Sequence, residues 1–182
     1  MKTYLRLSIA IFILCTNNVL AETPAEAATP AGMTLSTNGF LDKMAMPTLY
    51  TCDGKDISPA LSWAGAPEKA ASFALVMKDI DAPKGPLYHW VVYNIAKTAQ
   101  ELPEAAPLPA GASVAVNSFD KPSYSGPCPP KGAAHTYVFT LYALDSKLTL
   151  PKDADATTTL SALKSHIIGQ ADITGVYSRW IQ

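Results

Sequence analysis

Two acids and a histidine flank a short turn in the middle of the chain. Asp79 and Asp81 follow the apolar run of residues 73–77, and a turn rich in proline and glycine separates them from His89. Side chains two residues apart in a strand lie on one face, and proline with glycine favours a tight turn. Strand, turn and strand would thus bring two carboxylates and an imidazole together. Solvated turn acids and a structural histidine would give the same pattern, so both interpretations stay open.

A second candidate segment lies further along the chain. Residues 124–132 contain three prolines and two glycines, which restrict the backbone of this loop. Glycine lets a ligand approach main-chain N–H groups, and successive N–H groups can form a nest for an anion. His135 begins the apolar run that follows, and Tyr137 lies on the same face by a period of two. The alternative is a rigid structural loop that precedes a core histidine and tyrosine.

Most of the remaining pattern predicts strands. Valine, isoleucine and aromatic residues favour strands at 72–78, 90–95 and 135–144. Weaker strands are expected at 33–40, 61–63, 113–117 and 173–177, with a possible edge segment at 44–47. The spacing of Leu160, Leu163 and Ile167 predicts one helix over residues 156–168. Many strands with one late helix indicate a mainly β domain with packed sheets.

Length and charge exclude several classes of protein. The chain has 182 residues, 48% of them hydrophobic and 16% charged, which suits one folded domain. Its net charge is −1 and it has no basic block. We therefore expect neither a nucleic-acid partner nor an electrostatic membrane anchor.

The first 21 residues have the pattern of a signal peptide. Lys2 and Arg6 precede a short apolar run at 7–15, and Ala21 suits a cleavage site. The run is too short for a transmembrane anchor, and the bulky Leu14 argues against lipid attachment at Cys15. Residues 22–32 lack large apolar side chains, so a flexible mature N-terminus is expected. The mature protein would be periplasmic or secreted.

Two cysteines, Cys52 and Cys128, remain after that cleavage. Exported proteins commonly use paired cysteines as disulfides. The sequence therefore predicts one bridge, with two free buried thiols as the alternative.

Several spaced motifs together resemble the phosphatidylethanolamine-binding protein (PEBP) family, and most closely its bacterial Raf-kinase-inhibitor-like branch of YbhB/YbcL type. The resemblance covers residues 33–180. The motifs are Asp79-x-Asp81-Ala82-Pro83, His89-Trp90-Val91-Val92-Tyr93-Asn94-Ile95, Gly126-Pro127-Cys128-Pro129-Pro130-Lys131-Gly132 and His135-x-Tyr137-x-Phe139, with matches at 52–54, 58–63 and 175–179. Ile80 departs from the pattern, because the family usually has proline between the two acids.

The resemblance implies a mainly β fold of one domain, residues 33–182. It has a large central antiparallel sheet, a smaller second sheet and a few peripheral helices, one of them near residues 156–168. It also implies a small pocket for phosphate-like anions such as the phosphatidylethanolamine head group. The ligand residues expected from it are Asp79, Asp81, Pro83, His89, Gly126, Pro127, His135 and Tyr137. A Cys52–Cys128 bridge would hold the pocket wall against the sheet edge.

Carboxylates in an anion site are explained if they orient imidazoles. A carboxylate that accepts one ring N–H fixes the tautomer, and a protonated ring then donates its other N–H to the anion. We therefore expect phosphate to bind more tightly as pH falls through the histidine range. No cofactor and no metal are expected, and the function is expected to be binding, with a modulatory effect on a protein partner left open.

Two other functions use the same residues. A hydrolase would use the Asp and His side chains for metal binding or acid–base catalysis, but the sequence has no strong zinc spacing and no Gly-x-Ser-x-Gly motif. An inhibitor of proteases or kinases, suggested by other members of the resembled family, would present a surface loop. No stretch of the sequence identifies such a loop.

Overall fold

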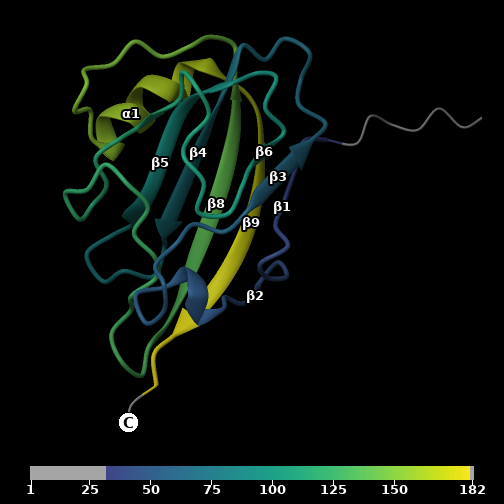
Figure 1. Cartoon of the computed structure of the whole chain (residues 1–182). Helices are drawn as coiled ribbons and strands as arrows, with labels where there is room; N and C mark the ends of the chain where they lie inside the picture. The colour runs from purple at the N-terminus through teal and green to yellow at the C-terminus, as the bar shows by residue number, and fades with distance from the viewer. Residues whose placement is uncertain (1–31, 181–182) are drawn as a thin grey trace, which may run out of the picture.

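Two β-sheets and one α-helix form three layers in this computed structural model, which describes residues 32–180 (Figure 1). The predicted signal peptide and all but the last residue of the predicted segment 22–32 lie outside the described residues. The elements are β1 (Thr34–Ser36), β2 (Met44–Ala45), β3 (Leu61–Ala64), β4 (Ser72–Asp79), β5 (Leu87–Ala96), β6 (Glu101–Leu102), β7 (Ser113–Val114), β8 (Ala134–Leu144), α1 (Ala156–Leu163) and β9 (Ile167–Ser178), with short 3-10 turns at Thr48–Tyr50 and Lys164–His166.

The large sheet has the strand order β2-β9-β8-β4-β5-β7. Its pairs are antiparallel except for the short parallel pair β2–β9. The register sets Asp79 of β4 opposite Tyr137 of β8, and His135 of β8 opposite Tyr177 of β9. The end of β4, the start of β8 and the end of β9 therefore meet at one end of the sheet, the end nearest the C-terminus in Figure 1.

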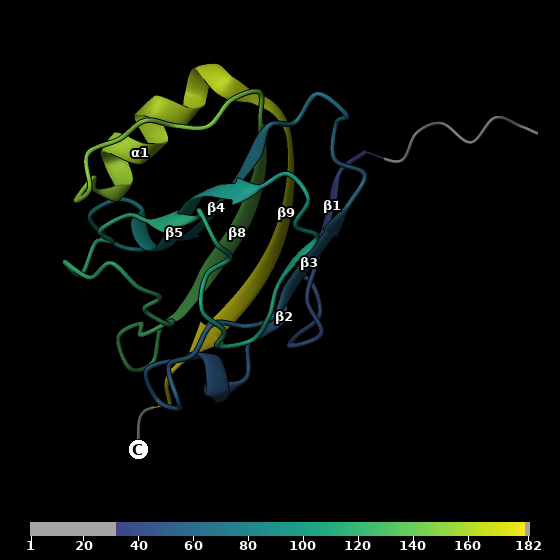
Figure 2. The same ribbon diagram turned by 45° about the horizontal axis from the view of Figure 1, so that its top comes forward.

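Each face of the large sheet is covered by a different layer (Figure 2). The small sheet, β1-β3-β6, packs on one face, where Phe73, Leu75 and Met77 of β4 belong to a core cluster with Trp63 of β3. On the other face, alternate residues of β4 pack in a second cluster with Leu163 of α1. Both faces of β4 are thus buried, which explains why its sequence is apolar without alternation.

The helix is shorter than the sequence predicted. The side chain of Asp155 caps it by accepting a hydrogen bond from the Thr158 N–H, and α1 ends at Leu163. A 3-10 turn follows, and Ile167 already belongs to β9, where it pairs with Leu144. The predicted helix over 156–168 is therefore wrong at its end, because the i, i+3, i+7 spacing joined residues of two elements. The predicted last strand, 173–177, correspondingly begins earlier.

No helix among residues 32–180 is long and apolar enough to cross a membrane. The mainly β class, the two sheets and the single α-helix of the described region confirm the predicted fold class.

Candidate ligand-binding site

A buried acid–imidazole pair lies where β4 ends. Asp79 is 3% exposed, and its Oδ2 lies 2.7 Å from Nδ1 of His135 at the start of β8. Its other oxygen accepts a hydrogen bond from the Asp81 main-chain N–H at 2.9 Å. Asp79 therefore fixes the orientation of the His135 ring, as predicted for carboxylates of an anion site.

Asp81 has a different role from Asp79. It lies exposed in the turn after β4, and its Oδ2 accepts the main-chain N–H of Thr136 at 2.8 Å. Hydrogen bonding from Thr136, first from its side chain and then from its main-chain N–H, holds the pKa of Asp81 below its ordinary value. Asp81 thus ties the turn to β8 rather than binding an imidazole. Pro83 lies exposed in the same turn.

A β-bulge places the second histidine. Met77 of β4 pairs with Trp90 of β5, and Lys78 pairs with Tyr88, so His89 between them has no partner in β4. Bulges commonly redirect a side chain beside a functional site. Here His89 packs edge-on against Tyr137, with ring centroids 5.2 Å apart, while its neighbour Trp90 belongs to the same core cluster as Tyr137.

The carbonyl and the ring of His89 bind the loop before β8. Its main-chain oxygen accepts hydrogen bonds from the Ser125 N–H and from Nδ2 of Asn117, both at 3.1 Å. Its ring Nδ1 lies 2.7 Å from the Ser125 carbonyl oxygen. A carbonyl oxygen can only accept, so Nδ1 carries a hydrogen and Nε2 is the free ring position. Burial lowers the pKa of His89, which favours the neutral ring.

Two buried polar atoms, on rings that pack against each other, have no partner. Nε2 of His89 and the hydroxyl of Tyr137 are both buried and make no hydrogen bond within the described part of the chain. The Asp79 carboxylate and the Cys128 N–H influence the Tyr137 hydroxyl, but neither has hydrogen-bonding geometry with it. Burial, followed by the charge of Asp79, raises the pKa of Tyr137 well above its ordinary value, so the phenol stays neutral.

Phe119 covers this site. It packs edge-on against His89, with ring centroids 4.9 Å apart, although 39% of Phe119 is exposed to solvent. Its main-chain N–H donates to Oδ1 of Asn117 at 2.9 Å. An aromatic side chain on a surface loop therefore lies between His89 and the solvent.

The loop 124–132 is held against the turn that contains Cys52. The N–H of Gly126 donates to Oδ1 of Asp56 at 2.6 Å. A Cβ at Gly126 would collide with the Tyr50 carbonyl oxygen and the Asp56 carboxylate, so this position needs glycine for packing. The N–H groups of Ser125 and Gly132 also donate within the protein. These three N–H groups are therefore not free for the predicted anion nest.

The predicted disulfide is present between Cys52 and Cys128. The two Cα atoms are 5.4 Å apart, and the Cys52 N–H donates to the Pro127 carbonyl oxygen at 3.1 Å. The bridge thus joins the loop before β8 to the turn that follows the first 3-10 helix.

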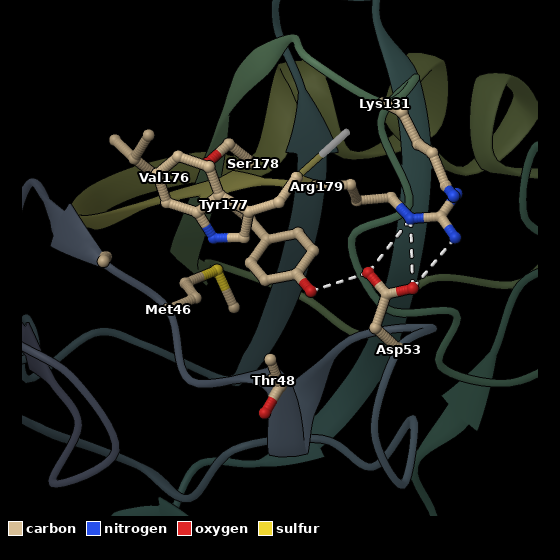
Figure 3. A pocket seen from close by; sticks show the side chains of 10 residues that line it. Met46, Thr48, Asp53, Lys131, Val176, Tyr177, Ser178 and Arg179 are labelled. Carbon is tan, nitrogen blue, oxygen red and sulfur yellow. Dashed lines mark hydrogen bonds and ion pairs between the residues drawn. The ribbon is translucent and has the colours of Figure 1, made fainter. Parts of the chain in front are cut away.

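Two pockets lie near this end of the large sheet, and neither is lined by a predicted ligand residue. One, of about 560 Å³, lies along the end of β9 (Figure 3). There the Tyr177 hydroxyl and the Arg179 guanidinium both point at Asp53 and hold the pKa of its carboxyl below its ordinary value. The other, of about 380 Å³, lies beside Trp90 and Tyr124.

Between residues 32 and 180, no three His, Cys, Asp or Glu side chains lie close enough to hold a metal ion. A Ser–His–Asp cluster does exist on the surface, but Ser146 Oγ and Asp145 Oδ1 both contact Nδ1 of His166, at 3.0 and 2.8 Å. A catalytic triad uses opposite ring nitrogens for its serine and its acid, so this cluster lacks that geometry.

Two residues of the site, Asn117 and Phe119, were not identified from the sequence, and Ser125 was included only as part of the predicted loop 124–132. Asn117 is buried and bonds the His89 carbonyl, the Ser125 hydroxyl and two N–H groups of its own loop. Asparagine favours turns that its side chain closes. Asn117 stands just before a loop rich in proline and glycine, so the sequence did indicate a turn there. Its contact with His89 depends on the fold.

Comparison with known proteins identifies the family. The profile described as phosphatidylethanolamine-binding protein matches residues 36–178. A UPF0098 protein of Methanothermobacter thermautotrophicus is 42% identical over 151 residues, which cover 81% of this chain and 99% of that protein. A Mycobacterium tuberculosis protein provisionally named lipoprotein LppC is 37% identical over 158 residues, covering 86% of this chain and 77% of that protein.

Solved structures agree with the sequence comparison. Escherichia coli YbcL, described as a member of the mammalian PEBP family, is 32% identical, with a TM-score of 0.78 over 84% of this chain and all of that chain. The Chlamydia trachomatis PEBP homologue CT736 is 34% identical, with a TM-score of 0.76 over 81% of this chain and 98% of that chain. Sequence and fold therefore place this chain in the phosphatidylethanolamine-binding protein family.

Proposed function

We propose that this protein is an exported, non-catalytic binding protein for a small phosphoryl-type anion. The observation that carries the proposal is the pair of unpartnered buried atoms, His89 Nε2 and the Tyr137 hydroxyl. A buried polar group without a hydrogen bond costs about 1–3 kcal/mol. The two groups belong to rings that pack against each other, and both would gain partners if a ligand entered. Membership of a family named for phosphatidylethanolamine binding supports a phosphoryl ligand.

The side chains at this site, those of Asp79, His89, His135 and Tyr137, have the chemistry to bind an oxyanion. The neutral Tyr137 hydroxyl is a hydrogen-bond donor. When the His135 ring is protonated, its Nε2–H becomes a second donor, and Asp79 holds the Nδ1–H in place. Charge-assisted bonds of this kind are about twice as strong as neutral ones. Phe119, which lies over His89, would have to move for the ligand to enter.

Export is supported by three independent features. The first 21 residues have a signal-peptide pattern. The Cys52–Cys128 disulfide is typical of proteins in oxidising compartments. A relative from Mycobacterium tuberculosis carries a provisional lipoprotein name. Sequencing the N-terminus of the protein recovered from a periplasmic or culture fraction tests this; a mature protein that begins at residue 22 is expected.

The binding site is tested by calorimetric titration with inorganic phosphate and phosphoethanolamine. Tyr137→Phe removes the unpartnered hydroxyl and keeps the ring, so affinity should fall about tenfold while the fold is retained. Tyr177→Phe is the matched control, because the Tyr177 hydroxyl donates to Asp53 outside the site. Equal affinities for both variants, or no binding by the unaltered protein at millimolar ligand, would refute the site.

The proposal that the protein does not catalyse a reaction needs a separate assay. We expect no turnover of phosphomonoesters or phosphodiesters by the purified protein, with or without added divalent metals. Turnover that His135→Gln abolishes and His166→Gln retains would show that the site is catalytic. His166 is a suitable control because it lies on the surface, bonded to Asp145 and Ser146.

A further inference from the structure

We infer that this site selects oxyanions that still carry a proton, and so binds inorganic phosphate and phosphomonoesters in preference to phosphodiesters and sulfate. The inference rests on the proposed function, because it concerns the same site. It follows from which ring nitrogen of His89 is free and from what the neighbouring atoms already bind.

The first step is to establish which ring nitrogen of His89 donates a hydrogen bond and which accepts one. The Ser125 carbonyl lies 2.7 Å from Nδ1 and takes the Nδ1 hydrogen. In the neutral ring Nε2 then has a lone pair and accepts a hydrogen bond. Nε2 is buried and unpartnered. The atom of His89 that faces the ligand therefore needs a donor, and a fully deprotonated oxyanion has none to offer.

The second step is the Tyr137 hydroxyl beside it. The phenol is neutral and unpartnered, so it donates to a ligand oxygen. A P–OH group satisfies both residues, since its hydrogen bonds His89 Nε2 and its oxygen atoms accept from Tyr137. A deprotonated oxyanion would satisfy the tyrosine and leave two lone pairs facing each other at His89.

The third step is the surrounding charge. The groups that surround His89 include the acids Asp79 and Asp56, the phenol of Tyr137, and His135 beyond Asp79. Asp79 is occupied by His135 and the Asp81 N–H, and Asp56 by the Gly126 N–H. Neither carboxylate supplies a hydrogen. Both carboxylates make an added double negative charge unfavourable, so a singly charged ligand with one proton fits best.

The ligand class follows from this polarity. Phosphomonoesters have a second pKa of about 6, so part of the population carries a P–OH near neutral pH. Phosphodiesters and sulfate carry no proton there. The esterified head group of phosphatidylethanolamine is a diester, so its monoester counterpart, phosphoethanolamine, should bind better. Sulfate has the same tetrahedral shape as phosphate, which makes it a sensitive comparison.

The test compares methyl phosphate, dimethyl phosphate and sulfate by calorimetric titration at pH 6.5. We expect methyl phosphate to bind about tenfold or more tightly than the other two, the effect of one buried acceptor left unsatisfied. Raising the pH to 8 should weaken both ligands, but methyl phosphate more than inorganic phosphate, because the dianion of inorganic phosphate keeps one proton and that of methyl phosphate keeps none. Equal affinities for the three probes would overturn the inference and leave the proposed function intact. No binding of any probe would refute both.

A second measurement reads the hydrogen on His89 directly in the unaltered protein. The chain has three histidines, so ¹⁵N spectra of the imidazoles are simple to assign with His166→Gln and His135→Gln. The unliganded protein should show His89 with hydrogen on Nδ1 alone, and methyl phosphate should shift Nε2 as it gains a hydrogen bond. A hydrogen on Nε2 would overturn the inference. His89→Gln offers both a donor and an acceptor, so its phosphate-to-sulfate preference should fall toward one.

Discussion

The two acids of the Asp-x-Asp pair show how one residue type acquires two roles. Asp79 is the last residue of β4, is buried and binds the ring of His135. Asp81, two residues on, is exposed and binds a main-chain N–H. The first acid thus acts on the chemistry of the site, and the second fixes the turn beside it. Substitution of Asp79 by asparagine should therefore affect ligand binding more than the same change at Asp81.

His89 should make the protein sensitive to acid. Its pKa is lowered in the folded state by burial, relative to an ordinary value of about 6.5. As pH falls below about 6.5, the unfolded chain takes up a proton that the folded protein does not, so the free energy of unfolding decreases. Urea denaturation between pH 7.5 and 5 should show a smaller pH dependence for His89→Gln than for the unaltered protein.

His166→Gln serves as the reference for that titration. It removes a surface histidine and leaves His89 in place. If His89→Gln keeps the same acid dependence as the unaltered protein, burial of His89 is not the cause.

At the scale of elements, the bulge in β5 and the loop 117–125 form one unit. The bulge leaves the His89 carbonyl outside the β4–β5 pairing, and Asn117 and Ser125 bond it. The loop therefore depends on the bulge for its attachment, and the ring of His89 depends on the loop for its orientation.

Asn117→Ala should weaken both the attachment of the loop and the orientation of the His89 ring. It leaves the His89 carbonyl and two loop N–H groups with fewer partners, which should lower the free energy of unfolding by about 3 kcal/mol. Phosphate affinity should fall as well, since the Ser125 carbonyl no longer fixes the ring. Denaturation and calorimetry measure the two effects.

Asn94→Ala is the matched control for Asn117. Asn94 also makes two side-chain bonds to a distant segment, at Leu148, but away from the site. It should lower stability and leave affinity unchanged. An affinity loss of equal size in both variants would mean that Asn117 has no specific role at His89.

Phe119 is expected to limit access to the site. Because its ring covers His89, Phe119→Ala should raise the association rate of phosphate several-fold, measured by stopped-flow mixing. Leu41→Ala removes another exposed apolar side chain on a different segment and should leave the rate unchanged. A rate that is the same in Phe119→Ala and the unaltered protein would show that the ring does not control entry.

At the scale of the whole molecule, the disulfide joins distant parts of the chain. Cys52 and Cys128 are separated by 76 positions. In the chain-entropy treatment, a bridge that closes a loop of this size stabilises by about 4–5 kcal/mol. Reduction should lower the denaturation midpoint accordingly. It should also weaken phosphate binding, because the bridge holds the loop that carries Ser125 against its supporting turn.

A double variant tests the bridge without reductant. Cys52→Ser with Cys128→Ser should reproduce the loss of stability and affinity seen on reduction. Alkylation of two thiols in the unreduced protein would show that the bridge does not form, and unchanged affinity in the folded double variant would separate the bridge from the site.

The sequence by itself determined the fold class, the family, the disulfide partners and most of the candidate site residues. β-branched runs mark strands, several spaced motifs carry the resemblance to the family, and Cys52 and Cys128 are the two cysteines that lie outside the predicted signal peptide. The motifs around Asp79, His89 and His135 are short and contiguous, so their residue types remain visible without any structure. The predicted end of the helix was wrong because Leu163 and Ile167 keep helical spacing although Ile167 already belongs to a strand.

The tertiary structure decided which groups interact and which atom of each pair donates the hydrogen bond. Asp79 binds His135 and not His89, because the β4–β8 register places Tyr137 opposite Asp79. The bulge at His89 and the covering Phe119 depend on pairing between segments far apart in the chain. The Ser125 carbonyl fixes the hydrogen on His89. Hydrogen-bond direction depends on distances between such segments, and a one-dimensional pattern does not contain those distances.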